Sequence, residues 1–307
     1  MLFSDMIYIR PDYYDAFHCT ADRCRHSCCV GWEIDIDAES LDFFKGVSGS
    51  LGEKLRCSID TENEPHFILD KNERCPFLTE NGLCELIIAL GEDSLCDICT
   101  EHPRFYNSYP ERFEMGLGAC CEEAARLITE GKESVRLLCE SDEESERNTP
   151  AIFVLRDELF QRLSVASLSL PHRIRSAASL FDLSFGNFNA AETVAFYDTL
   201  ERMDEEWTDC LKLLEAFNDF DVLYQALDTI RYERITEYFL YRHFAEAVDE
   251  EDAAARFAFA ILSTEIICAL ELSGHADALR LYSSEIEYSD ENVDLILDAI
   301  KDGKLSM

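Results

Sequence analysis

The sequence predicts a mainly α-helical protein with a cysteine-rich front region containing one or two short β-hairpins, followed by a helical bundle. Eleven of the 14 cysteines lie between Cys19 and Cys121. After residue 150, apolar residues recur at helical spacing and helix breakers are few. The 307 residues, 47% of them apolar, are enough for one large core or two smaller ones. We therefore expect a cysteine-rich region over 1–139, an acidic linker or loop over 140–149 and a helical region over 150–307.

Short elements are predicted in the cysteine-rich region. Apolar residues at 32, 34 and 36 alternate with acidic ones, which is typical of a strand. Asp37 is a candidate N-cap for a helix over 38–45, and residues 66–69 form a second strand candidate.

A hairpin turn is predicted at Asn81-Gly82, since this dipeptide adopts the backbone of a two-residue turn readily. The turn would join 75–78 to 83–84. A helix is expected over 85–90, with Gly91 as its end.

Helices are predicted throughout the second half of the chain. Apolar periodicity supports helices around 155–163, 211–218, 235–242, 257–270 before Gly274, and 292–301 before Gly303. No repeat of fixed period is present, so a compact bundle is expected rather than a solenoid.

The formal net charge is −36, from 27 basic and 63 acidic side chains. Phosphate backbones would be repelled, so nucleic acid is not an expected partner. A basic, lysine-bearing protein would be attracted. The alternative is an acidic surface that only keeps the protein soluble.

Neither a membrane nor an export route is predicted. No run of about 18 uncharged apolar residues occurs, and the nearest approach, 257–270, is interrupted by Glu265. Residues 1–10 lack a basic segment followed by an apolar run, so no signal peptide is expected. We expect the reducing cytoplasm, where thiols stay free or bind metal.

The cysteine spacing indicates metal or cluster binding. Cys24 and Cys28 would share one face if their segment were helical. Cys75 and Cys84 flank the predicted hairpin, and Cys96-x2-Cys99 is a chelating loop found in zinc and iron–sulfur sites alike. The isolated cysteines are expected to be inert: Cys57, Cys139, Cys210 and Cys268.

The spacing leaves zinc and iron–sulfur both open. One structural zinc uses four ligands, so two zinc ions, or one cluster with spare thiols, fit the number of cysteines better. Histidines that could complete a zinc site are His18, His26, His66 and His102.

A series of motifs over residues 11–127 resembles the flagellin lysine-N-methylases. They are Pro11-Asp-Tyr-Tyr14, Cys19-x4-Cys24-x3-Cys28-Cys29, Gly31-Trp-Glu-Ile-Asp-Ile-Asp37, Arg74-Cys-Pro-Phe-Leu78, Gly82-Leu-Cys84, Ser94-Leu-Cys-Asp-Ile-Cys99, His102-Pro-Arg-Phe105 and Cys120-Cys-Glu-Glu-Ala-Ala125. The cysteine motifs are also similar to small cysteine-rich proteins described as zinc- or iron-chelating. The helical half carries no motif that matches.

The resemblance implies a bacterial enzyme that methylates lysine side chains of flagellin with S-adenosylmethionine and requires an iron–sulfur cluster, of the 4Fe-4S type. It places the cluster ligands among Cys24, Cys28, Cys29, Cys75, Cys84 and Cys96, with Cys19, Cys99 and Cys120 as further candidates.

Lysine methylation needs a neutral amine, so the protein must either desolvate the lysine or place a base or carboxylate near it. Glu33 and Asp35 follow the first cysteines, and Tyr13 could orient the amine; the alternative is that the two acids only form the solvated face of a strand. No Gly-x-Gly-x-x-Gly motif occurs, so a doubly wound cofactor domain is not expected. We expect cluster iron to chelate the amino and carboxylate groups of S-adenosylmethionine. The alternative function is a non-enzymatic zinc- or iron-binding module whose acidic helical region binds a protein.

Overall fold

The computed structural model describes residues 6–140 and 149–307 and divides into two compact units. The cysteine unit consists of His18–Phe105 and Cys121–Glu123, and the helical unit holds the remaining described residues. These boundaries differ from the predicted boundary at 140–149, because the strand at the start of the chain pairs with strands of the helical unit. Residues 141–148, most of the predicted acidic linker, lie outside the described residues.

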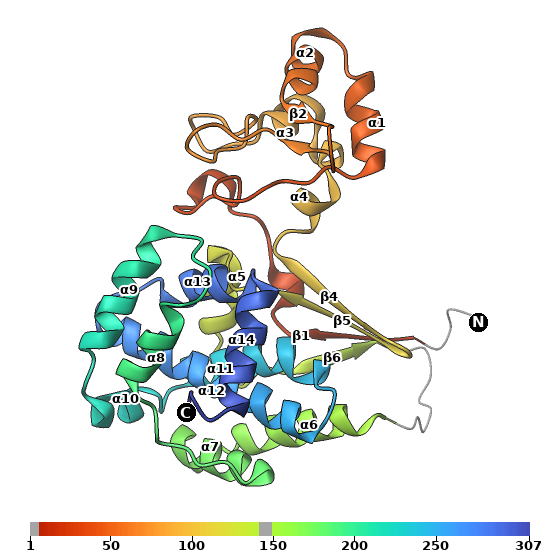
Figure 1. Ribbon diagram of the computed structural model, residues 1–307. Helices are drawn as coiled ribbons and strands as arrows, with labels where there is room; N and C mark the ends of the chain where they lie inside the picture. The colour runs from red at the N-terminus through yellow and green to blue at the C-terminus, as the bar shows by residue number, and fades with distance from the viewer. Residues whose placement is uncertain (1–5, 141–148) are drawn as a thin grey trace. The chain divides into compact units, whose positions relative to one another are not determined.

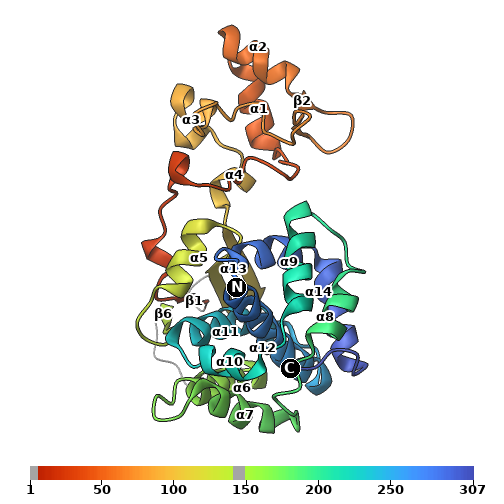
Figure 2. The same ribbon diagram turned by 90° about the vertical axis from the view of Figure 1, so that its left-hand side faces the viewer.

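The cysteine unit is built from short elements joined by loops (Figure 2). Its helices and strands are η3 Ala21–Arg23, α1 Ala38–Gly46, α2 Gly49–Cys57, β2 Ile59–Asp60, β3 His66–Phe67, α3 Glu85–Leu90, η4 Glu92–Ser94 and α4 Asp97–Glu101.

Several predicted elements of this unit are confirmed. The Asp37 carboxylate accepts a bond from Ser40 N, 2.8 Å, and caps α1. Gly82 has a φ of +75° in a turn where Leu78 pairs with Cys84, and Gly91 ends α3. The strand predicted over 32–36 forms only one bridge, between Asp35 and His66, because β3, its partner, is just two residues long. The segment with Cys24 and Cys28 is not helical.

A small apolar core holds the cysteine unit together. It joins Ile34 and Ile36 from the extended segment to Phe44 of α1 and Leu86 of α3, and includes the thiols of Cys75 and Cys96. The alternation seen in the sequence therefore reports which side chains point inward.

The helical unit combines one sheet with most of the helices (Figure 1). Its strands are β1 Ile7–Pro11, β4 Arg104–Tyr109 (which begins in the cysteine unit), β5 Arg112–Leu117 and β6 Leu137–Glu140. Its helices are η2 Tyr14–Ala16, α5 Glu122–Thr129 (whose first two residues belong to the cysteine unit), α6 Ala151–Leu163, α7 Leu170–Ala178, η5 Ser179–Phe181, α8 Ala190–Tyr197, α9 Glu205–Ala216, α10 Phe220–Ala226, α11 Ile230–His243, η6 Phe244–Glu246, α12 Glu250–Leu272, α13 Ala278–Tyr282, the π-helical turn η7 Ser283–Glu287 and α14 Asp290–Lys301.

The strands of this unit form a four-stranded sheet in the order β4-β5-β1-β6, which the sequence reasoning missed. β1 is parallel to β5 and antiparallel to β6. One reason that the sequence did not reveal this sheet is a charge at an inward position of β5. Glu114 is fully buried there and forms a two-pronged ion pair with buried Arg156, at 2.5 and 2.7 Å. A buried ion pair hides the apolar alternation that marks a strand.

The predicted helical bundle and mainly α class are confirmed, with α11 and α12 packed against each other in the interior. By length and hydropathy α12 would qualify as a membrane span, but 89% of its apolar window is buried within the protein. It is therefore the core helix of the described helical unit, and Gly274 follows its end with a φ of +100°.

Candidate functional site

Five cysteines of the cysteine unit form what we call the inner thiol group: Cys29, Cys75, Cys84, Cys96 and Cys99. Cys75 N donates to the Cys29 carbonyl, 2.9 Å, which places these two backbones side by side. The turn at Gly82 brings Cys84 back beside the segment that starts at Cys75. The Sγ atoms of Cys96 and Cys99 are 3.4 Å apart. Two thiolates on one tetrahedral ion would be about 3.8 Å apart, so this last pair is already spaced as a chelate.

The thiols of this group influence one another. Burial raises the pKa of Cys75 to about 12, and the neighbouring Cys29 and Cys84 add to that rise. A hydrogen bond from the Cys28 thiol lowers the pKa of Cys29 to about 7. The bond between Cys96 and Cys99 lowers the pKa of Cys96 and raises that of Cys99. Thiolate charges in the group are thus limited by shared protons, which a bound cation would replace.

A second set, the outer thiol group, contains Cys19, Cys24, Cys28 and Cys121. The thiol of Cys28 bonds to that of Cys29 in the inner group and interacts more weakly with those of Cys19 and Cys121, and the thiol of Cys24 interacts with that of Cys19. The sequence reasoning did not include Cys121 among the ligands. No signal in the sequence singles it out, because its position depends on Glu122, which binds the distant loop after Cys24.

Within residues 6–140 and 149–307, no three or more histidine, cysteine or acidic side chains already form a cage ready for a metal ion. The donors nevertheless suit a soft metal, because most are thiols and the inner ones lie in or against the apolar core. The inner group includes five of the nine predicted ligands, and Cys19, Cys24 and Cys28 belong to the outer group. The ninth, Cys120, is placed in the helical unit, where its thiol donates to the Tyr288 hydroxyl, 3.1 Å.

The four cysteines expected to be inert differ in exposure. Cys57 and Cys139 are exposed, whereas Cys210 and Cys268 are buried in the helical core.

The histidines have other roles in the described residues. His26 Nδ1 bonds Glu122, 2.9 Å, and His66 Nδ1 lies 2.9 Å from the Glu64 carbonyl. Burial lowers the pKa of His102 to about 4, and its ring lies 5.8 Å from that of Trp32. His18 is exposed.

The predicted catalytic residues are in different places. Glu33 and Asp35 are exposed on the cysteine unit, and Glu33 reaches to 3.9 Å from His66 Nε2. Tyr13 is buried in the helical unit, and burial raises its pKa above the usual range.

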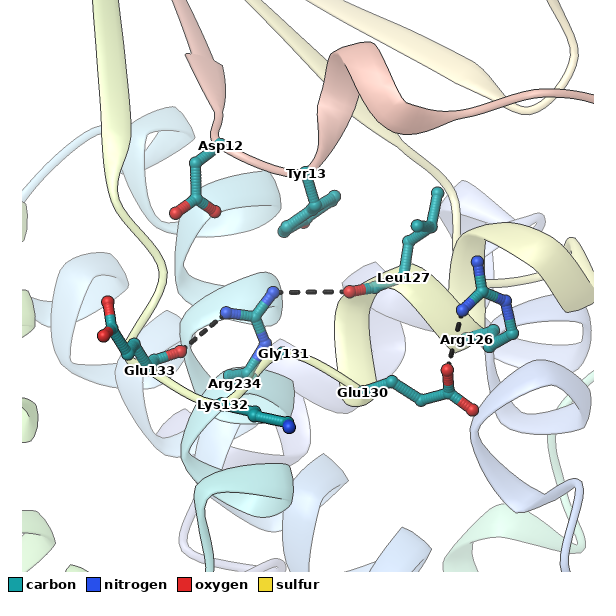
Figure 3. A pocket seen from close by; sticks show the side chains of 9 residues that line it. All are labelled: Asp12, Tyr13, Arg126, Leu127, Glu130, Gly131, Lys132, Glu133 and Arg234. Atoms are coloured by element: carbon teal, nitrogen blue, oxygen red, sulfur yellow. Dashed lines mark hydrogen bonds and ion pairs between the residues drawn. The ribbon is translucent and has the colours of Figure 1, made fainter.

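Tyr13 lines a pocket of about 440 Å³ in the helical unit (Figure 3). The other lining residues are Asp12, Arg126, Leu127, Glu130, Gly131, Lys132, Glu133 and Arg234. The Arg234 guanidinium donates to the carbonyls of Leu127, Ile128 and Glu133, at 2.6 to 3.3 Å, and lies 5.6 Å from the centre of the Tyr13 ring. An added Cβ at Gly131 would overlap this guanidinium, so glycine permits the loop to lie against it.

The carboxylates of the pocket differ in their partners. Glu130 pairs with Arg126 at 2.7 Å, and Asp12 with Arg136 at 3.2 Å. The pocket therefore combines acidic groups and an aromatic ring with three basic residues, of which Arg126 has a carboxylate partner and Arg234 carbonyl partners.

Sequence comparison finds curated relatives of the chain. A lysine-N-methylase of Salmonella typhimurium is 25% identical over 189 residues, which cover 56% of this chain and 45% of that protein. The chain is similar to lysine-N-methylases. The same protein of Salmonella choleraesuis matches equally, and flagellar biosynthetic protein FliU of Salmonella muenchen is 26% identical over 140 residues, 41% of this chain and 79% of FliU.

This similarity confirms the resemblance to lysine-N-methylases inferred from the motifs. The chain spans less than half the length of the lysine-N-methylases it matches. No family model matches the chain, and no solved structure matches it.

Proposed function

We propose that the protein methylates lysine side chains of flagellin, or of another lysine-bearing protein, in the bacterial cytoplasm, using S-adenosylmethionine and an iron–sulfur cluster. The observation that carries this proposal is the gathering of five thiols, drawn from separate motifs, in a chain similar to lysine-N-methylases. The net charge of −36 favours a substrate rich in lysine.

The inner thiol group is the part of the chain that fits a cluster. A 4Fe-4S cluster is held by cysteine thiolates, and this group supplies five, at the edge of an apolar core. When bound, the cluster supplies Lewis-acidic iron able to hold the amino and carboxylate groups of S-adenosylmethionine, which itself supplies an electrophilic methyl group.

The remaining tasks belong to the protein's own residues: binding the lysine and removing a proton from its ammonium. We assign substrate recognition to the pocket at Tyr13 in the helical unit. Carboxylates of Asp12, Glu130 and Glu133 attract the ammonium of a lysine of the substrate protein. The Tyr13 ring, kept neutral by its raised pKa, packs against the methylene chain. Glu33 and Asp35, exposed on the cysteine unit, are the candidates to accept the proton of the lysine that is methylated.

The test uses protein purified without oxygen, flagellin and S-adenosylmethionine with a labelled methyl group. Methyl-lysine is measured by mass spectrometry of flagellin peptides. We expect Cys96→Ser to abolish both iron binding and methylation, and Cys57→Ser, in an exposed thiol of the same unit, to change neither. Asp12→Asn should raise the KM for flagellin with iron content unchanged.

Methylation by iron-free protein would contradict the cluster requirement. Equal affinity of cluster-loaded and cluster-free protein for S-adenosylmethionine, measured by calorimetry, would contradict chelation by iron. A colourless protein with stoichiometric zinc and no methyl transfer would instead support the non-enzymatic module.

A further inference from the structure

We propose that the outer thiol group, Cys19, Cys24, Cys28 and Cys121, is a second metal site beside the inner group, which binds one zinc ion and fastens residues 19–28 to the start of α5. The proposal shares with the proposed function the assignment of iron to the inner group, but it does not depend on methyl transfer.

The first argument is that the segment contributes no side chain to a core. None of residues 18–28 is buried, and their only regular structure is the single turn η3. A segment without core side chains gains little from folding and is usually held by a cross-link or a metal. Ala21 is nevertheless held at a φ of +51°, a left-handed backbone that is costly for alanine.

The second argument is the turn that presents two of the thiols. Ala21 N donates to Cys19 Sγ, 3.4 Å, and the Thr20 hydroxyl and Cys24 Sγ are 2.9 Å apart. The turn at Ala21 therefore folds Cys24 back toward Cys19, as a chelate from one short segment requires.

The third argument is the position of Cys121. Its neighbour Glu122 accepts bonds from the backbone of Arg25, 2.9 Å, and of His26, 2.7 Å. These bonds bring the start of α5 against the loop between Cys24 and Cys28. A residue about a hundred positions away thereby joins the other three, and the thiol interactions of Cys28 agree with that placement.

Four thiolates suit a structural zinc ion, which takes four sulfur ligands in a tetrahedron and leaves no position open. Binding forms four zinc–sulfur bonds and releases four thiol protons to solvent, with no electron transferred. The site would carry net negative charge, and the exposed guanidinium of Arg25 in the same loop lies 3.8 Å from the Glu122 carboxylate. A closed site of this kind fits a staple rather than a catalytic centre.

The experiment measures iron, acid-labile sulfide and zinc per chain in full-length protein purified without oxygen. We expect roughly four iron and one zinc. The double variant Cys24→Ser/Cys121→Ser should lose at least nine-tenths of the zinc and keep the iron, whereas Cys96→Ser should lose iron and keep zinc. Cys57→Ser is the matched control and should change neither.

Loss of iron together with zinc in soluble Cys24→Ser/Cys121→Ser protein would overturn the proposal, since one shared site would then explain both groups. Full iron without zinc in the wild type would also overturn it. If the double variant does not fold, cobalt replaces zinc in the wild type and in the single variants Cys19→Ser and Cys28→Ser. A thiolate-to-cobalt absorption band that persists in both single variants would equally overturn it. If zinc and iron are lost independently in these variants but the wild type does not methylate lysine, the zinc site is supported and only the proposed function is refuted.

Discussion

The side chain of Glu122 is predicted to be the main clamp between the cysteine loop and the start of α5. Its carboxylate accepts bonds from Arg25 N and His26 N and from the His26 ring. These bonds lower the pKa of Glu122 despite its partial burial. A hydrogen bond to a charged group contributes about 1.5–3 kcal/mol. The two backbone bonds together therefore stabilise the loop by about 3 kcal/mol even at the lower figure, equivalent to about a hundredfold in an opening equilibrium.

Glu122→Ala should consequently speed amide hydrogen exchange at Arg25 and His26 by roughly tenfold to a hundredfold. Exchange is followed by mass spectrometry of peptides covering 20–30. The control is Glu130→Ala, which removes an exposed pair with Arg126 and should leave those peptides unchanged. Unaltered exchange at Arg25 and His26 in Glu122→Ala would refute the clamp, and with it the placement of Cys121 beside the loop.

Three further predictions concern the helical unit. Gly131→Ala forces a Cβ onto the Arg234 guanidinium and should destabilise the protein by about 2 kcal/mol, measured by thermal unfolding. Gly46→Ala, where an added Cβ meets open space, is the control and should leave the midpoint unchanged. An unchanged midpoint in Gly131→Ala would contradict the prediction. Arg242 and His243 lower the pKa of Glu287 from 4.5 to about 2, against the effect of its burial. The charged carboxylate therefore adds about 3 kcal/mol to the free energy of unfolding above pH 4.5, and this stabilisation is lost as the pH falls toward 2. In denaturation from pH 3 to 7, the stability of Glu287→Gln should fall less steeply on the acid side than that of the wild type, and an identical slope would argue against the depressed pKa. Burial raises the pKa of Glu237 to about 8, so the stability that its neutral form contributes below pH 4.5 is lost as the pH rises toward 8. Glu237→Gln should therefore gain stability relative to the wild type between pH 5 and 8. If the stabilities of the two proteins ran parallel over this range, the carboxyl would be charged in the folded state.

The local elements of the cysteine unit were within reach of sequence reasoning. The cap at Asp37 and the glycine at the end of α3 act through their own neighbours, so their effects are independent of distant contacts. The predicted strand over 32–36 shows the limit of this approach. Its inward and outward faces were correct, but its pairing depended on β3, which offers only two residues.

The sheet of the helical unit was not predictable in this way. β1 pairs with β5 and β6, both more than a hundred residues further along the chain. Periodicity within one segment carries no information about which distant segment will be its partner. Buried Glu114 also replaced an apolar side chain at an inward position, and only its ion pair with Arg156 explains how it is tolerated there.

For the candidate site, the sequence identified a cysteine-rich region and the resemblance that sequence comparison confirmed. It did not separate the thiols into groups, because spacing along the chain does not report which sulfurs are neighbours. The assignment of iron and of S-adenosylmethionine stays a prediction.

The sequence by itself determined which chemical groups are present and where the chain is helical: many thiols, strong acidity and a helical second half. These depend on residue type and on periodicity, which are local properties of the chain. Only the tertiary structure decided which thiols are neighbours, since that follows from bonds such as Cys75 N to the Cys29 carbonyl and Arg25 N to Glu122. Such contacts depend on how distant segments pack, and the same cysteine spacing is compatible with many packings.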